Sequence, residues 1–287
     1  MAPFSISPLR RLAAMRVGRA TSVATARVVP EETAVALVFD GATHAVMMAS
    51  PADLEDYAVG FALTEGKIAA PDDIIGMDIV VHEAGIEARL WLEALCGRTN
   101  ALRRRAMLGP TGCGLCGIES LEQALPPVPR VDEGACLTAA DVAAAVASLR
   151  PAQVLNAEAA ALHAAGLWRQ GSGLVVVRED VGRHNALDKL AGALAREGTS
   201  VHDGIIVLTS RVSVEMVQKA AMIGATVVVA VSAPTALAVR TAEAAGITLV
   251  GIARADAFEV FTHAHRITDA HRDGHQTEQG AMAHAVC

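Results

Sequence analysis

The sequence predicts an α/β fold: a layered, parallel or mixed sheet with helices on both faces, preceded by a smaller strand-rich α+β part. Two observations support the main layer. Runs of Val, Ile and Leu recur between residues 173 and 252, and helical segments separate them. Near-continuous apolar strands that alternate with helices are typical of a largely parallel sheet that is buried on both faces.

The second half of the chain supplies the elements of this layer. The expected strands are 174–178, 204–209, 226–231 and 247–252. The expected helices are 138–149, 157–165, 185–196, 213–223 and 236–245. The first two of these helices are alanine-rich segments that come before the strand–helix alternation begins.

The first half of the chain is expected to be strand-rich with one good helix. The expected strands are 33–40, 44–48, 77–81 and 87–95. Ser50 and Pro51 predict the start of the helix, because serine caps helices and proline suits the first helical position. Gly66 predicts its end. We therefore expect four parts: a disordered leader (1–30), an α+β subdomain that ends in a cysteine-bearing loop (31–130), an α/β domain (131–268) and a disordered tail (269–287).

Composition excludes several classes of function. The net charge of −7 argues against a general nucleic-acid binder, which would carry a broad basic face. No apolar run reaches the ~18 residues that a membrane span needs. The arginine-bearing leader lacks the long apolar segment of a secretory signal. Five cysteines in 287 residues indicate a reducing compartment, and we expect the cytoplasm.

Cys113 and Cys116 form a C-x-x-C motif among three glycines. On spacing alone such a pair is half of a zinc site, a dithiol redox centre, a sulfur carrier or two small buried side chains. The arginines at 103–105 and the helix-like segment after Gly117 favour thiolate over thiol. No second pair stands at zinc-finger spacing, so we expect no metal site.

Polar residues follow the four expected strands of the second half, where strand ends meet at one edge of the sheet. They include Arg183, Arg211, Ser232, Thr235 and Arg254. Backbone N–H groups, helix N-termini and guanidinium groups at one edge suit a phosphate or pyrophosphate. No G-x-G-x-x-G or Walker A sequence is present, which excludes the dinucleotide-binding Rossmann and P-loop interpretations.

These residues also have structural interpretations. Thr235 can start a helix, and Arg211 can pair with Glu215 one turn on. His184, next to Arg183, is either an acid–base group or a hydrogen-bonded structural histidine. The recurrence of such residues at one sheet edge favours the functional interpretation.

Several long motifs in order resemble the formate dehydrogenase accessory sulfurtransferases, over residues 31–262. The motifs are residues 50–55, 60–66, 113–117, 179–189 and 232–235. The resemblance implies a fold similar to cytidine deaminases, usually as a homodimer. It implies that a cysteine desulfurase loads Cys113 with persulfide sulfur, that Cys116 assists, and that the sulfur passes to bis(molybdopterin guanine dinucleotide) for formate dehydrogenase.

The resemblance also places cofactor contacts just after the last strand of the sheet. The residues are Ile252, Ala253, Arg254, Ala255, Asp256 and Ala257. GDP is the expected mimic of the cofactor. The chain departs from the family pattern at Ile252, where relatives commonly carry an aromatic residue.

Two other functions compete with the sulfur carrier. A zinc-dependent nucleobase deaminase would need H-x-E followed by P-C-x-x-C, but Gly112 precedes Cys113 and no H-x-E comes before it. A non-catalytic cofactor chaperone would keep its function without the two thiols.

Overall fold

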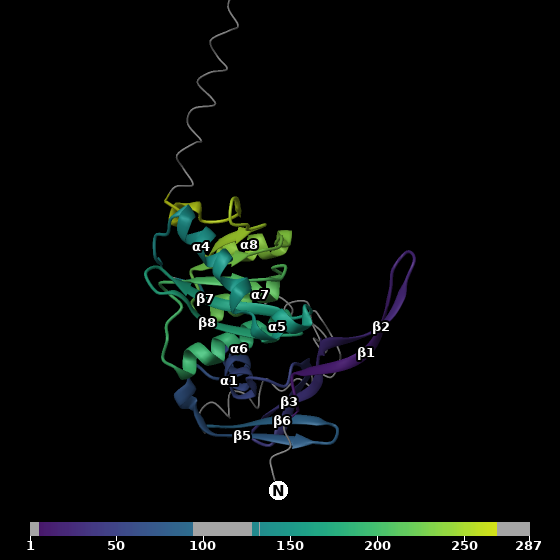
Figure 1. Cartoon of the computed structure of the whole chain (residues 1–287). Coiled ribbons are helices and arrows are strands. Elements are labelled where there is room, and N and C mark those ends of the chain that lie inside the picture. Colours follow the sequence, from purple (N-terminus) through teal and green to yellow (C-terminus); the bar gives the residue numbers. More distant parts are fainter. Residues whose placement is uncertain (1–5, 94–127, 132, 269–287) are drawn as a thin grey trace, which may run out of the picture.

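The structure, a computed structural model, describes residues 6–93, 128–131 and 133–268 (Figure 1). Over these residues the chain forms a six-stranded sheet, a four-stranded sheet and a two-stranded hairpin. None of the helices described there is both long and apolar enough to cross a membrane.

The six-stranded sheet is mixed and has the order β12-β11-β10-β9-β7-β8. Its strands are β7 (His163–Arg169), β8 (Gly173–Asp180), β9 (Ile205–Leu208), β10 (Val227–Ala230), β11 (Thr248–Gly251) and β12 (Glu259–Val260). Strands β9, β10 and β11 are parallel, whereas β7 runs antiparallel to both β9 and β8. Strand β8 therefore has the same direction as β9–β11, and the carboxyl ends of these four strands lie at one edge.

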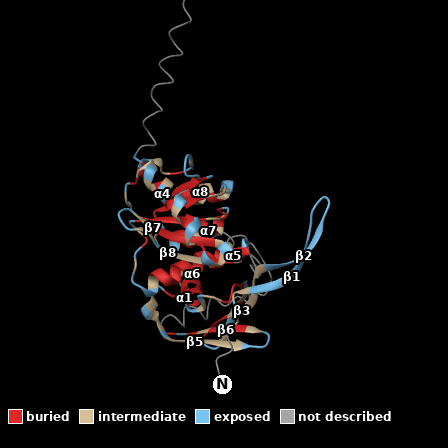
Figure 2. Cartoon of the chain, viewed as in Figure 1, coloured by how far each residue is buried: buried red, intermediate tan, exposed pale blue. Residues whose placement is uncertain are grey.

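Helices cover both faces of this sheet, as the sequence predicts. Helix α4 (Ala139–Leu149) lies on one face; α6 (Arg183–Arg196), α7 (Val214–Met222) and α8 (Ala236–Ala245) lie on the other (Figure 1). Successive residues of a strand point to opposite faces, so Ile206 packs in the core under α6–α8 and Val207 in the core under α4. Both cores are buried (Figure 2).

The expected helix at 157–165 is wrong in its second half. Helix α5 (Val154–Ala159) ends at Ala160 in a left-handed conformation, and β7 begins at His163. The alanines favour a helix, but Ala164–Leu167 lie between two neighbouring strands with both faces covered, and this burial overrides the local preference. The strand expected at 174–178 is present as β8. It lies at the edge of the sheet and is therefore only partly buried.

The four-stranded sheet has the order β4-β3-β6-β5 and a hydrophobic core of its own with α1 (Leu54–Thr64). Its strands are β3 (Thr33–Phe39), β4 (Ala42–Ala49), β5 (Ile74–His82) and β6 (Gly85–Leu92). Short 3-10 turns lie at Pro71–Asp73, Arg150–Ala152 and Ala264–Arg266. Helix α1 begins after Asp53, later than the expected start at Ser50 and Pro51.

Ser50 contacts the other part of the chain instead of capping α1. Its backbone N–H donates to Asp180 Oδ2 at 2.9 Å, and its hydroxyl accepts from the Val181 N–H at 3.1 Å. The side chain is fully buried. The local sequence resembles a helix N-cap, but Ser50 forms these long-range hydrogen bonds instead.

Residues 9–30 differ from the expected disordered leader. Strands β1 (Leu9–Val17) and β2 (Ser22–Pro30) pair in antiparallel register along their whole length around a turn at Gly18–Thr21. Figure 1 shows this hairpin extending away from the rest of the molecule. The valines and the two threonines of this segment suit a strand.

Helices α1 and α6 join the two parts of the chain at a very close crossing. A Cβ atom on Gly60 would lie 1.7 Å from the carbonyl oxygen of Asp188, and one on Gly192 would lie 1.8 Å from that of Asp56. Both contacts are with backbone, which cannot rotate away. Glycine is thus required on both helices where they cross.

Buried charges surround this crossing and link three helices. Lys189 Nζ lies 2.7 Å from Asp180 Oδ2, and both side chains are fully buried. Lys219 Nζ, from α7, lies 3.0 Å from both Asp188 Oδ1 and Glu65 Oε1. Burial lowers the pKa of Lys219, but the charges of Asp188 and Glu65 outweigh it and raise this pKa overall. Of these contacts, the Lys219–Glu65 pair joins the two parts of the chain, because Glu65 follows α1 and Lys219 lies on α7.

We predict that Gly60→Ala destabilises the protein by about 3 kcal/mol or more, because the new methyl group must push two helix backbones apart. Urea unfolding followed by circular dichroism measures this change in the free energy of unfolding. Gly18→Ala is the control, since a Cβ there meets only ordinary contacts at 3.4 Å and beyond. Equal stability of the two variants would show that the crossing tolerates a side chain.

Candidate functional site

The carboxyl edge of the six-stranded sheet gathers five of the predicted residues. Arg183 is the first residue of α6 after β8, and Arg211 follows β9. Ser232 and Thr235 follow β10, and Arg254 follows β11. These strands share one direction, so the structure brings to one edge residues that span 72 positions of sequence from Arg183 to Arg254.

Backbone hydrogen bonds join the loops after β9, β10 and β11, and we call this joined surface, residues 209–213, 231–235 and 252–257, the ledge. Between the loops after β9 and β10, the Thr235 N–H donates to the Val212 carbonyl at 2.9 Å. Between the loops after β10 and β11, the Ile252 N–H donates to the Ser232 carbonyl at 3.2 Å, and the Ala253 N–H to Ala230 at 3.0 Å. The ledge therefore has a fixed backbone shape.

Arg254 holds two of these loops together. Its Nη1 donates to the carbonyl oxygens of Val231 at 2.5 Å and Ala253 at 2.8 Å, while its backbone N–H donates to Ala257 at 2.8 Å. The residue is nevertheless exposed. Its guanidinium is thereby positioned at the surface of the ledge, where a ligand can reach it.

Ile252, in the predicted cofactor-contact stretch, has a strained backbone. Its φ of 52° lies in the left-handed region, which is costly for a β-branched residue. The preceding Gly251 is tightly enclosed, since a Cβ there would lie 2.8 Å from Pro234 Cδ. Such strain costs about 1–3 kcal/mol, persists only when the surroundings enforce it, and is common at ligand sites.

Three helices of nine or more residues begin at the same edge. Gly182, Ser213 and Thr235 precede α6, α7 and α8 respectively. The first N–H groups of each helix and its dipole favour an anion there. The prediction that Thr235 can start a helix is confirmed. Its hydroxyl accepts a hydrogen bond from the Ala238 N–H at 3.2 Å and caps α8.

A histidine–carboxylate cluster, which the sequence did not predict, lies beside Arg183. His184 Nε2 is 3.7 Å from Glu215 Oε2, so Glu215 pairs with His184 and not with Arg211 as one interpretation expected. Burial raises the pKa of Glu215, but its interactions with the nearby His184 and Ser213 side chains outweigh burial and lower this pKa to about 2. Burial and the charge of Arg183 lower the pKa of His163.

No local pattern in the sequence reveals the pairing of His184 with Glu215. His184 and Glu215 are 31 positions apart, and only the packing of α6 against α7 brings them together. A helix-face pattern within one segment cannot reveal such a pair.

Most of the motif at 179–189 serves the interface between the two parts. Asn185 Nδ2 donates to Asp180 Oδ1 at 2.9 Å and to the Met48 carbonyl at 2.8 Å, and Asn185 Oδ1 accepts from Tyr57 at 3.0 Å. Asp180 Oδ1 also accepts from the Gly182 N–H at 2.7 Å. These bonds fix the start of α6, and hence Arg183, relative to the N-terminal part.

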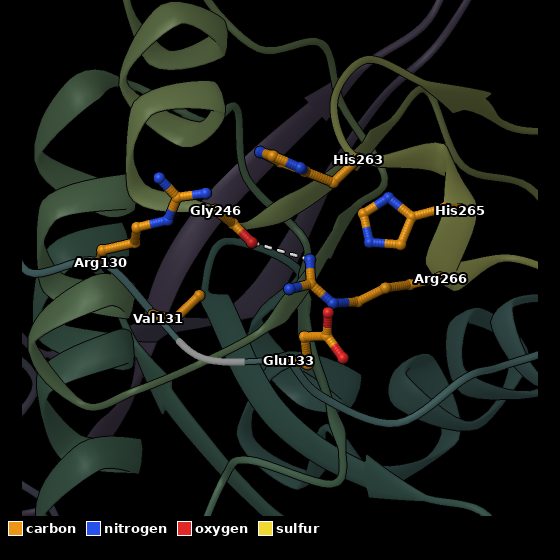
Figure 3. Close-up of a pocket in the computed structure, with 7 residues that line it drawn as sticks. All are labelled: Arg130, Val131, Glu133, Gly246, His263, His265 and Arg266. Atoms are coloured by element: carbon orange, nitrogen blue, oxygen red, sulfur yellow. Dashed lines mark hydrogen bonds between the residues drawn. The ribbon is translucent and has the colours of Figure 1, made fainter.

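A pocket of about 330 Å³ lies at the opposite edge of the sheet (Figure 3). It includes Arg130, His263 and Arg266. Arg266 Nη1 donates to the Gly246 carbonyl at 2.7 Å, and His263 Nε2 lies 2.9 Å from the Glu243 carbonyl. Both side chains thus contact backbone carbonyl groups at the C-terminus of α8.

Cys113, Cys116 and the arginines at 103–105 lie outside the described residues. In the described part of the chain, Cys136 is an exposed free cysteine. No group of three or more His, Cys, Asp or Glu side chains suited to a metal ion occurs among the described residues.

Known proteins resemble this chain over most of its length. The sequence model of the FdhD/NarQ family matches residues 30–268. The sulfur carrier protein FdhD of Agrobacterium fabrum is 51% identical over 259 residues, which cover 90% of this chain and 96% of the relative. The FdhD protein of Brucella abortus is 54% identical over 247 residues, which cover 86% and 92%.

A solved structure has the same fold. It is described as a candidate formate dehydrogenase accessory protein from Desulfotalea psychrophila, and it matches with a TM-score of 0.70. The match covers 90% of this chain and 99% of the other at 24% identity, so this likeness concerns the fold alone.

We predict that Glu215 contributes stability above about pH 4.5 that is lost as the pH falls towards 2, because its pKa is depressed in the folded state. Glu215→Gln should therefore show a shallower fall in the free energy of unfolding between pH 5 and pH 3 than the wild type. Glu243→Gln, at an exposed position, should keep the wild-type slope. Identical slopes for all three proteins would contradict the role of Glu215.

Proposed function

Because the chain belongs to the FdhD/NarQ family, we propose that it is a sulfur carrier. It accepts persulfide sulfur from a cysteine desulfurase on Cys113 and transfers this sulfur to bis(molybdopterin guanine dinucleotide), which formate dehydrogenase requires. The observation that most supports the cofactor half of the proposal is the ledge at the carboxyl edge. There, exposed Arg211 and Arg254 lie close to three helix N-termini.

The ledge suits the guanine dinucleotide half of the cofactor. Its pyrophosphate would meet helix N–H groups and the fork-shaped donors of arginine. The contact residues are Arg183, Arg211, Ser232 and Thr235 with the segment 252–257. Thr235 caps α8 through its side chain, so we assign it to shaping the ledge as well as to binding.

Loading of sulfur is an exchange between two thiols. The Cys113 thiolate attacks the outer sulfur of the desulfurase persulfide; a new S–S bond forms on Cys113, and the old one breaks. The electron pair leaves with the desulfurase sulfur, which takes up a proton. No oxidant or reductant is consumed.

Release of sulfur uses the second thiol. The Cys116 thiolate attacks the inner sulfur of the Cys113 persulfide, which forms a Cys113–Cys116 disulfide and frees the outer sulfur as hydrosulfide for the molybdenum. A cellular thiol reductant then restores the two thiols. The protein therefore delivers sulfur at the sulfide level.

The expected setting follows from this chemistry. Thiols that must cycle between free and loaded forms need a reducing compartment, so we place the protein in the cytoplasm. Its partners are the cysteine desulfurase and formate dehydrogenase. We propose that it acts as a homodimer.

We predict that incubation with a cysteine desulfurase and cysteine adds about 32 Da, one sulfur atom, to the peptide that contains Cys113 and Cys116. Mass spectrometry of the intact peptide measures this. Cys113→Ala should abolish the addition, and Cys136→Ala, which removes an exposed cysteine elsewhere, should leave it unchanged. Sulfur that remains on other cysteines of an active Cys113→Ala protein would refute the assignment.

We predict that Arg254→Ala weakens GDP binding roughly ten- to hundredfold, since a charge-assisted contact contributes about 1.5–3 kcal/mol. Titration calorimetry measures the affinity. Arg240→Ala is the matched control because it removes the same charge from an exposed position on α8. Persulfide loading should be unchanged in both variants. Equal GDP affinities for the wild type and Arg254→Ala would mean that Arg254 does not contact the nucleotide.

A further inference from the structure

Phe261 is an exposed aromatic residue beside the ledge. It follows β12 directly and is 37% exposed, whereas Phe39 and Phe61 are buried in the core of the four-stranded sheet. Its place on the sheet is fixed by hydrogen bonds. The Phe261 N–H donates to the Leu249 carbonyl at 2.8 Å, and the hydroxyl of the next residue, Thr262, accepts from the Leu249 N–H at 2.9 Å.

The ring of Phe261 reaches the carboxyl edge of the sheet. Phe261 lies opposite Leu249 in the antiparallel pairing of β11 with β12, so both side chains point to the face that α8 covers. A Cβ atom on Gly251 would lie 2.9 Å from Phe261 Cε2, which shows that the ring leans over this glycine. Gly251 is the last residue of β11, and the ledge continues from the next residue.

The ring also adjoins the loop after β10. The same Cβ atom on Gly251 would lie 2.8 Å from Pro234 Cδ and 3.4 Å from the Ser232 carbonyl oxygen. Pro234 immediately precedes Thr235, the N-cap of α8. An aromatic ring therefore lies beside helix N–H groups that suit a phosphate.

Ile252 extends this apolar surface along the ledge. It is 41% exposed, and its backbone N–H is bonded to the Ser232 carbonyl. Scattered exposed apolar residues are normal on proteins and need no functional explanation. Ile252 and Phe261, however, flank the same glycine, and Arg254 follows two positions after Ile252. An apolar surface thus continues a cationic one.

A nucleotide presents both kinds of surface to a protein. Its phosphates need N–H donors and cations, and its base has a flat π-face that packs on an aromatic ring. We propose that Phe261 is the platform on which the base of the bound nucleotide packs, with Ile252 beside it, while the ledge holds the phosphates. This inference rests on the proposed cofactor site and adds the residue that receives the base.

Titration calorimetry of the full chain with GDP, UDP and pyrophosphate tests the platform. The wild type should bind GDP more tightly than UDP or pyrophosphate, because a purine covers more of the ring. Phe261→Ala should weaken GDP binding roughly five- to hundredfold, the usual range for the loss of one base–aromatic stack, and should leave pyrophosphate binding unchanged. Phe261→Tyr keeps the ring and should keep the GDP affinity.

Trp91→Ala is the matched control, since it removes an aromatic residue of similar exposure, 40%, from β6 of the other sheet. It should leave binding of all three ligands unchanged.

The comparison with pyrophosphate separates a base platform from a structural role. Equal losses of GDP and pyrophosphate affinity in Phe261→Ala would mean that the residue only shapes the ledge, and would overturn the proposal. A wild type that binds GDP and pyrophosphate equally well, or a Phe261→Ala protein with wild-type GDP affinity, would also overturn it. A wild type that binds none of the three ligands would refute the cofactor site itself, and the platform with it.

Discussion

The crossing of α1 and α6 is the contact on which the rest of the structure depends. Gly60 and Gly192 let the two helix backbones touch, and no side chain fits there. Beside this contact, Glu65 at the end of α1 pairs with Lys219, which also pairs with Asp188, and the Lys189–Asp180 pair is fully buried. Removal of one partner from such a pair is costly, typically about 3–5 kcal/mol, because a buried charge remains. The two sheets are therefore held in one relative position.

The relative position of the two sheets also fixes the start of α6 at the candidate site. Helix α6 contributes its middle to the crossing and its first residue, Arg183, to the carboxyl edge. Asp180 and Asn185 bind both Ser50 and Met48 of the N-terminal part, so the N-terminal part helps to fix the start of α6. The loops of the ledge are held by backbone hydrogen bonds, by Arg254 and by the strained turn at Ile252, so the proposed ligand would meet a fixed surface. Such a preorganised site loses little freedom on binding.

The sequence predicted what depends on local pattern and missed what depends on distant contacts. Strands β9–β11 and their helices were found because apolar runs of β-branched residues alternate with helical segments. Strand β7 was missed because its alanines favour a helix until neighbouring strands enclose it. Ser50 resembled a helix cap, yet it bonds to Asp180. The pairing of His184 with Glu215 and the hairpin at residues 9–30 depend on packing and register that no short window of sequence contains.

We propose that one chain carries sulfur from a donor thiol to the guanine dinucleotide cofactor. This proposal can be tested by following ³⁵S from labelled cysteine, through a desulfurase and this protein, to the cofactor of formate dehydrogenase. We expect labelled, active formate dehydrogenase with the wild type, and neither label nor activity with Cys113→Ala. Equal labelling and activity with Cys113→Ala would contradict it and would instead indicate a chaperone that needs no thiol.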